Sequence, residues 1–305
     1  MRFDLAALAA RLPARPLTRF APSPTGYLHL GHVVNAIYVW GLARALGGRV
    51  LLRIEDHDRL RSRPEFDAAL LEDLTWLGFE PDAGPVRQSD EPHVYEDAVA
   101  RLAHSHRVYA CNCSRKDIAA AGDATAGNEV PYSGRCRNLQ VPRSMFLVPG
   151  SGLRVEIAPG EERFIDALLG EQRQDPSRQC GDLLIRDRDG HWTYQFAVTV
   201  DDVRQDIDLV VRGADLLAST GRQIRLARML GRAEPPVFVH HGLLLKPSGE
   251  KLSKSSGDTG VRELRASGAS APDVIGRAAA LAGLVDEPRP IRANDVDELI
   301  GRAEL

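Results

Sequence analysis

Residues 19–32 read Arg-Phe-Ala-Pro-Ser-Pro-Thr-Gly-Tyr-Leu-His-Leu-Gly-His, and this stretch decides the fold. Its first residues form a short apolar run, and the prolines at 22 and 24 then exclude a helix and keep the chain extended. From 33 to 46, apolar side chains recur at helical spacing. The stretch therefore predicts a strand, a tight loop and a helix, with His29, Gly31 and His32 at the helix start.

A helix N-terminus with a close-approach glycine is suited to binding an anion, because its backbone N–H groups point outward. Two imidazoles at this position can donate to phosphate oxygens and stabilise charge that develops at phosphorus. On the tetrapeptide His29-Leu-Gly-His32 alone, two surface histidines beside a helix cap are the commoner interpretation.

Residues 49–54, Arg-Val-Leu-Leu-Arg-Ile, are predicted to form a buried parallel strand that ends at Glu55. In open α/β sheets, ligands bind beyond the carboxyl ends of the strands, where a carboxylate can hold an ammonium group. A solvated loop charge is the simpler alternative for an isolated glutamate. A metal site formed with Asp56 and Asp58 is a minor alternative.

The next segments indicate alternating strands and helices. Residues 64–77 and 95–104 are predicted helices, and 84–90 is a predicted turn-rich loop. Later, 206–212 and 237–240 are predicted strands that flank a helix at 219–230. This order predicts a doubly wound α/β domain with a parallel sheet. Small antiparallel strands at 145–179 and a hairpin over 181–200 suggest an inserted domain.

Three of the four cysteines cluster in the middle of the chain. Cys111, Cys113 and Cys136 bring three thiolates, and Tyr132 adds a phenol oxygen. Tetrahedral zinc takes four such donors, and the bond to it would tie together a polar loop. Tyrosine is an unusual ligand, so water or an aspartate remains open as the fourth donor. Cys180 stands apart, as a buried or free thiol.

Near the C-terminus, Lys251-Leu-Ser-Lys-Ser255 lies in a segment rich in Gly and Ser. Lysine ammonium groups on such a loop can close over a triphosphate and neutralise the leaving pyrophosphate. Without other signals, a lysine- and serine-rich loop is usually a solvated turn.

Taken together, these motifs resemble the class I aminoacyl-tRNA synthetases of the glutamyl/glutaminyl group. His29-Leu-Gly-His32 is similar to the HIGH signature and Lys251-Leu-Ser-Lys-Ser255 to the KMSKS signature, with Leu replacing Met. The resemblance implies catalysis by His29, His32, Lys251 and Lys254, and ATP binding by His29, Gly31, His32 and Lys254. It assigns glutamate binding to Arg19, Phe20, Ala21, Pro22, Ser23, Glu55, Tyr194 and Arg212. It also assigns a zinc-binding knob to Cys111, Cys113, Tyr132 and Cys136. Residues 194–202 are similar to the helix by which the family's chain re-enters the main domain.

The same resemblance implies a domain division. Residues 1–104 and 191–245 would be two halves of a Rossmann-like catalytic domain. Residues 105–190 would be an inserted zinc-binding, tRNA-contacting domain, and 246–305 the signature loop with a short helical region. Only about fifty residues follow Ser256, whereas a full glutamyl-tRNA synthetase carries a large anticodon-binding region there.

This shorter form resembles the glutamyl-Q tRNA(Asp) synthetase family. That likeness implies activation of L-glutamate with ATP and magnesium, without tRNA, and transfer to queuosine in the anticodon loop of tRNA(Asp). Arg222, Arg225 and Arg228 are candidate contacts to the stem, although a solvated helix face is their commoner role. Alternatives are a minimal glutamyl-tRNA synthetase, a nucleotidyltransferase of the same superfamily and a catalytically idle tRNA-binding module.

Composition sets wider limits. Across 305 residues, 43% are apolar and the net charge is −3, which excludes a protein whose main task is to coat nucleic acid. No apolar run reaches membrane-spanning length, and four cysteines do not indicate a disulfide framework. We therefore expect a protein of the reducing cytoplasm. We also expect it to be a monomer.

Overall fold

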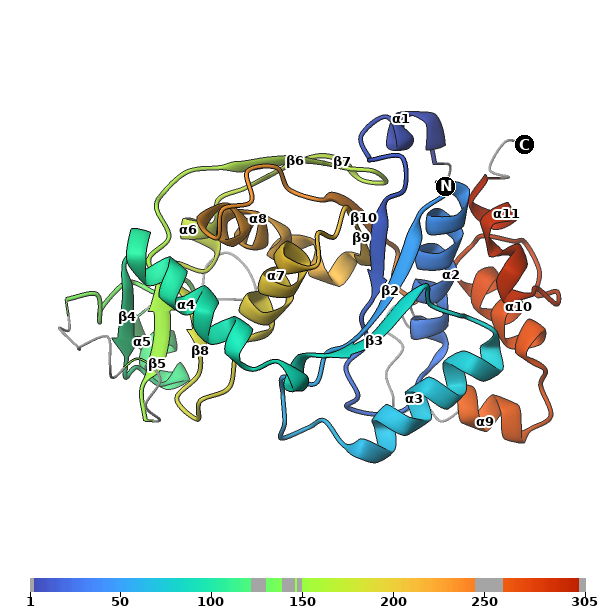
Figure 1. The fold of residues 1–305 in the computed structure, drawn as a ribbon, viewed down its shortest axis with the longest axis horizontal. Helices are drawn as coiled ribbons and strands as arrows, with labels where there is room; N and C mark the ends of the chain where they lie inside the picture. Colours follow the sequence, from blue (N-terminus) through green and yellow to red (C-terminus); the bar gives the residue numbers. More distant parts are fainter. Residues whose placement is uncertain (1–2, 122–129, 139–145, 147–149, 245–259, 302–305) are drawn as a thin grey trace.

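A parallel sheet with helices on both faces forms the centre of the molecule (Figure 1), in a computed structural model that describes residues 3–121, 130–138, 146, 150–244 and 260–301. In this described part, the sheet runs in the order β3 (Ala83–Arg87), β2 (Arg49–Ile54), β1 (Leu17–Phe20), β9 (Leu209–Gly213), β10 (Val237–His241), β6 (Glu162–Asp166) and β7 (Gly170–Gln174). All neighbours pair in parallel except β6 and β7. The α/β class is therefore confirmed.

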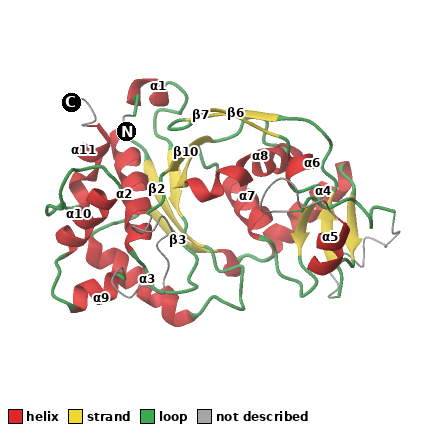
Figure 2. Ribbon diagram, turned by 180° about the vertical axis from the view of Figure 1, so that it is seen from behind, coloured by secondary structure: helices red, strands yellow, loops and turns green. Residues whose placement is uncertain are grey.

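One face of the sheet is covered by α2 (Leu30–Ala45), which runs from the end of β1. The predicted strand, loop and helix are thus confirmed. Against α2 pack α3 (Pro64–Leu77), α10 (Ala271–Leu281) and α11 (Val296–Gly301), with α9 (Val261–Ala266) beside them and α1 (Leu5–Ala9) contributing Leu8 to the same core. Figure 2 shows these helices together at one end of the molecule. The long, mostly apolar α2 is buried on nearly every side, which anchors its N-terminus.

The opposite face carries α7 (Tyr194–Arg204) and α8 (Thr220–Met229). Beyond them, at the far end, lies a three-stranded antiparallel sheet of β4 (Val108–Cys111), β5 (Gly152–Val155) and β8 (Leu183–Arg186). Three helices accompany it: α4 (His93–Ser105), α5 (Arg115–Ala121) and α6 (Pro176–Gln179). Leu102 of α4, Phe196 of α7 and Ile185 of β8 belong to one hydrophobic core, so the small sheet packs against α4 and α7.

Three local predictions are wrong. The predicted loop at 84–90 contains the edge strand β3. Its glycine and proline are more typical of turns than of strands, so the sequence pattern did not predict a strand there. The second arm of the predicted 181–200 hairpin is helix α7, in agreement with the helix that the family resemblance implied at 194–202, and only an isolated bridge joins Arg186 to Trp192. Strands β6 and β7 pair antiparallel as expected, but β6 adds to the main sheet beside β10 instead of to the insertion.

Short 3-10 turns complete the described elements at η1 (Gln88–Asp90), η3 (Ala214–Ser219) and η4 (Ala293–Asp295). Among the described residues, no helix combines the length and the apolar character needed to cross a bilayer.

Candidate active site

The N-terminus of α2 opens onto a cavity at the carboxyl ends of the parallel strands. His29 is the N-cap, and its Nδ1 accepts the Gly31 N–H at 3.1 Å, while Nδ1 of His32 accepts the His29 N–H at 3.1 Å. Since both Nδ1 atoms are acceptors, each neutral ring carries its proton on Nε2 and donates from there. A Cβ at Gly31 would lie 2.9 Å from the His29 ring, so glycine allows this fold-back.

Buried charges line the floor of the cavity. Arg19 at the end of β1 bonds Asp202 of α7, with Nε 3.0 Å from Oδ1. Arg53 at the end of β2 is fully buried and donates to both Asp202, at 2.8 Å, and Glu55, at 3.2 Å. Burial would raise the pKa of Asp202, but the guanidinium groups of Arg19 and Arg53 outweigh it and lower that pKa. Burial also raises the pKa of Glu55, against the opposing effect of Arg53.

Arg212 at the end of β9 is held differently. Its Nε lies 3.0 Å from Nε2 of His240, its Nη1 lies 2.7 Å from Oε1 of Gln223, and its Nη2 lies 2.8 Å from Oγ1 of Thr220. Although Arg212 is buried, no carboxylate among the described residues forms an ion pair with it. Its three partners are neutral, so its charge remains available to a ligand.

Tyr194, the first residue of α7, lies at the same site. Burial, followed by the charge of Glu55, raises the pKa of its phenol to about 12. Tyr194 therefore stays neutral and can donate a hydrogen bond.

The predicted side chains converge on one depression. A cavity of about 310 Å³ is lined by Arg19, Ala21, His29, Gly31, His32, Glu55, Tyr194 and Arg212, among others. A neighbouring cavity of about 360 Å³ shares Ala21, His32, Glu55 and Tyr194 and adds Phe20, Pro22 and Ser23. Lys251 and Lys254 lie outside the described residues.

Several site residues escaped the sequence analysis. Asp202, Arg53, Asn35 and His241 lie at or beneath the cavity. Arg53 stands in the same motif as Glu55, and its position in the middle of an apolar strand was the available signal. The metal site considered at Glu55, Asp56 and Asp58 receives no support, because these carboxylates have other partners. Asp56 accepts a hydrogen bond from the Ser89 N–H, and Asp58 forms an ion pair with Arg61.

The three arginines of α8 are engaged within the chain. Arg225 and Arg228 both form ion pairs with Glu162, and Arg225 also donates to the Ala158 carbonyl at 2.6 Å. Arg222 is buried. Arg225 and Arg228 therefore join α8 to β6, and a role of the three arginines in contacting an RNA stem does not follow from their positions.

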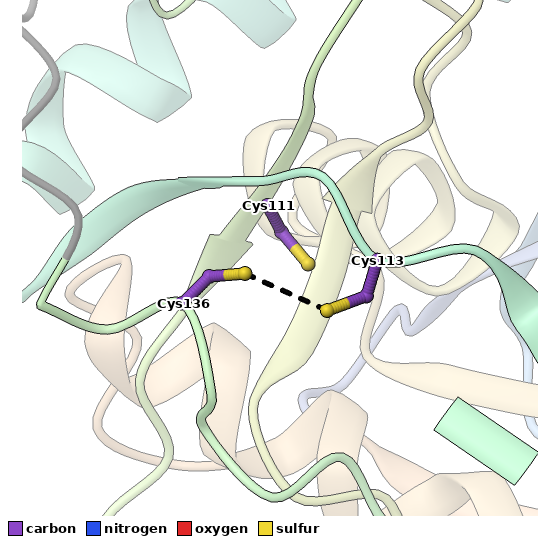
Figure 3. Close-up of side chains that lie close together, drawn as sticks. All are labelled: Cys111, Cys113 and Cys136. Carbon is purple, nitrogen blue, oxygen red and sulfur yellow. Dashed lines mark hydrogen bonds between the residues drawn. The ribbon is translucent and has the colours of Figure 1, made fainter. Parts of the chain in front are cut away.

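A second cluster lies in the small sheet, where the sulfur atoms of Cys111, Cys113 and Cys136 lie within 4.8 Å of one another (Figure 3). The Tyr132 oxygen is 3.4 Å from the Cys111 sulfur and 3.8 Å from the Cys113 sulfur. Tetrahedral zinc, with bonds of ~2.3 Å to sulfur, separates its ligand atoms by about 3.8 Å. The four predicted donors therefore fit such an ion. Cys180 is buried outside this cluster.

Arg154 of β5 contacts two members of the cluster, Cys111 and Tyr132. Its Nε donates to the Cys111 sulfur at 3.3 Å, and its guanidinium lies 3.8 Å from the centre of the Tyr132 ring. Gly181, at φ +65°, passes so close that a Cβ there would lie 2.1 Å from the Tyr132 carbonyl oxygen. The buried guanidinium can offset the negative charge of metal-bound thiolates.

Comparison with known proteins agrees with this geometry. Residues 17–283 match the family described as "tRNA synthetases class I (E and Q), catalytic domain". A curated relative from Symbiobacterium thermophilum, named glutamyl-Q tRNA(Asp) synthetase, is 43% identical over 94% of this chain and 93% of its own length. A relative of the same name from Rhodobacter capsulatus is 40% identical over 85% of this chain and 98% of its own length.

The chain belongs to the glutamyl-Q tRNA(Asp) synthetase family. It is therefore a ligase of the class I aminoacyl-tRNA synthetase type. Among solved structures, a glutamate tRNA ligase from Elizabethkingia meningosepticum in complex with its amino acid matches with a TM-score of 0.74 and 27% identity. That match covers 94% of this chain and 64% of the ligase chain, so the chain spans less than two thirds of it.

Replacing Asp202 with Asn should destabilise the synthetase by about 3 kcal/mol or more at neutral pH, because two buried guanidinium groups lose their anion. The folded-state pKa of Asp202 is depressed, so its carboxylate contributes stability above its unfolded pKa of about 3.9. That contribution is lost as the pH falls through the folded pKa. We expect the difference in free energy of unfolding, measured with urea, to narrow below about pH 4.

The exposed Asp286 provides the control, and Asp286→Asn should change the free energy of unfolding little at any pH. If the difference in free energy of unfolding between native protein and Asp202→Asn stays the same from neutral pH to below about pH 4, the ionic role of Asp202 is contradicted.

Proposed function

We propose that this synthetase activates L-glutamate with ATP to form glutamyl-adenylate without tRNA, and then transfers glutamate to queuosine in the anticodon loop of tRNA(Asp). The observation that carries the proposal is the arrangement of charged groups at the cavity. Glu55 can receive an ammonium group, and Arg212 is held by the neutral partners His240, Gln223 and Thr220. Free glutamate offers a side-chain carboxylate, which glutamine lacks.

In this proposal, Glu55 receives the ammonium group, and Arg212, which no described carboxylate neutralises, receives one carboxylate bidentately. The remaining N–H groups of Arg19 serve the other carboxylate, with Tyr194 and Ser23 as neutral donors. Glutamine would leave a guanidinium facing a neutral amide, at a cost of roughly 2 kcal/mol or more in a buried site. The site should therefore prefer glutamate by about thirtyfold.

In the first step, a glutamate carboxylate oxygen bonds to the α-phosphorus of ATP, the bond to the bridging oxygen breaks, and pyrophosphate leaves with the electron pair. ATP enters as its magnesium complex. His29 and His32 line the cavity at the N-terminus of α2, and their Nε2–H groups are proposed to stabilise the charge on the phosphates. Lys254, with Lys251, is proposed to neutralise the leaving group.

For the acceptor, the proposal rests on the printed names of relatives matched over nearly their whole length. A queuosine hydroxyl would attack the carbonyl carbon of the adenylate, AMP would leave with the electron pair, and the hydroxyl proton would be released. A minimal glutamyl-tRNA synthetase remains the alternative. Membership of the synthetase family disfavours the nucleotidyltransferase alternative.

We further propose one structural zinc ion, held by Cys111, Cys113, Tyr132 and Cys136. The convergence of the four donors and the guanidinium of Arg154 behind Cys111 support this site. Zinc would tie the segment around 132–136 to strand β4, away from the activation site.

Glutamate-dependent exchange of labelled pyrophosphate into ATP, measured without tRNA, tests the activation step. We expect exchange with glutamate and about thirtyfold less efficiency with glutamine. Lys254→Ala should lower the rate by about a hundredfold, because the leaving charge loses a donor. Lys116→Ala, on the surface of α5, is the control and should leave the rate unchanged. Absence of glutamate-dependent exchange in the native protein would refute the activation step.

Zinc content tests the metal proposal. Elemental analysis should find about one zinc per chain, and Cys136→Ser should lose it while retaining most of the exchange activity. Cys180→Ser, at a buried thiol outside the cluster, should keep the metal. Purification of native protein without metal under mild conditions, or equal zinc content in both variants, would argue against the site.

Labelled glutamate and two preparations of tRNA(Asp), with and without queuosine, test the acceptor. Label should appear only on the queuosine-bearing tRNA, and should remain after the 3′-terminal nucleotide is removed. Charging of tRNA(Glu) at its 3′ end, independent of queuosine, would instead identify a minimal glutamyl-tRNA synthetase.

A further inference from the structure

A buried chain of hydrogen bonds runs from Arg212 away from the cavity into the sheet. Arg212 donates to Nε2 of His240 on β10, and Nδ1 of His240 lies 2.7 Å from Oδ2 of Asp166 at the end of β6. The side chains of His240 and Asp166 are both fully buried. Neither His240 nor Asp166 was predicted as a site residue, and neither side chain lines the cavity.

The contacts define which nitrogen of His240 carries the proton. Besides His240, Asp166 accepts the backbone N–H groups of Leu168 and Leu169, at 3.0 and 2.9 Å. Burial would raise the pKa of Asp166, but the bonds from His240 and these amides outweigh it and lower the pKa. An ionised carboxylate only accepts, so the His240 proton lies on Nδ1 and the lone pair of Nε2 faces Arg212.

Neutral acceptors are an unusual choice for a buried guanidinium. Burial lowers the pKa of His240, which keeps the ring uncharged. Together with Gln223 and Thr220, the neutral ring orients Arg212 through three bonds without neutralising it. A carboxylate at position 240 would orient the guanidinium equally well but would cancel the charge that a substrate carboxylate needs.

We propose that His240 and Asp166 are positioning residues for substrate recognition: Asp166 fixes the tautomer of His240, and His240 holds Arg212 as an oriented, un-neutralised receptor for a glutamate carboxylate. This inference rests on the proposed glutamate activation. It also gives the β6–β7 hairpin a function, because its residue Asp166 supports the substrate-binding arginine from the edge of the main sheet.

Two variants of similar length separate this role from simple space filling. His240→Gln provides a carbonyl oxygen that can accept from Arg212, whereas His240→Met fills the space without a strong acceptor. We expect His240→Met to raise the KM for glutamate by about tenfold or more and to leave the KM for ATP unchanged. His240→Gln should stay within about threefold of the native KM. Exchange kinetics supply these values, and thermal unfolding monitors the fold of each variant.

A double-mutant cycle tests the tautomer directly. In Asp166→Asn, the amide N–H₂ can donate to Nδ1 of His240, so the imidazole proton moves to Nε2. Nε2 can then no longer accept the hydrogen bond from Nε of Arg212. The KM for glutamate should then rise by about tenfold or more. In the His240→Gln background no tautomer exists, so Asp166→Asn should raise that KM much less.

Equal glutamate KM values for His240→Gln and His240→Met, or additive effects of Asp166→Asn in the two backgrounds, would overturn the inference. If the native protein shows efficient glutamate-dependent pyrophosphate exchange and His240→Met has the native KM for glutamate, this inference alone is refuted. Native protein without any glutamate-dependent exchange refutes the proposed function instead.

Discussion

The ion-pair network beneath the cavity constrains the rest of the structure. Arg19, Arg53 and Glu55 project from the ends of β1 and β2 into an interior where isolated charges are costly. Asp202 of α7 joins both guanidinium groups, so α7 must lie across these two strand ends. The position of α7 in turn brings Tyr194 to the cavity, and the network thereby links the fold to the candidate active site.

Local periodicity predicted the long elements well, because α2 is apolar along its length, α3 carries an apolar stripe and β2 has an aliphatic centre. It failed where pairing partners decide the outcome. Residues 83–87 form an edge strand through backbone bonds to β2, despite a glycine and a proline. Antiparallel strands were predicted within 145–179, and β6 and β7 do pair in that way. Whether they join the insertion or the main sheet depends on β10, which lies more than sixty residues later in the chain.

The candidate site was predictable where family motifs or strand ends mark it, as for His29, Glu55 and Arg212. Residues that support these side chains were missed, because their signal is three-dimensional. In the sequence, His240 is one more residue of an apolar strand. Only the structure shows that it contacts Arg212 on one side and Asp166 on the other. The cysteine cluster was the opposite case, since the spacing of Cys111, Cys113 and Cys136 in the sequence already predicted that they lie together.

The central claim is that Arg212 lines the cavity as a guanidinium held by neutral hydrogen-bond partners, beside Arg19, which is paired with Asp202. A crystal structure of the protein with glutamate and a non-hydrolysable ATP analogue tests it most directly. The account predicts a glutamate carboxylate on Arg212 and the ammonium on Glu55, while Arg212 keeps its bonds to His240 and Arg19 keeps Asp202. Glutamate bound away from Arg212, or Arg19 released from Asp202 to take the ligand alone, would contradict it.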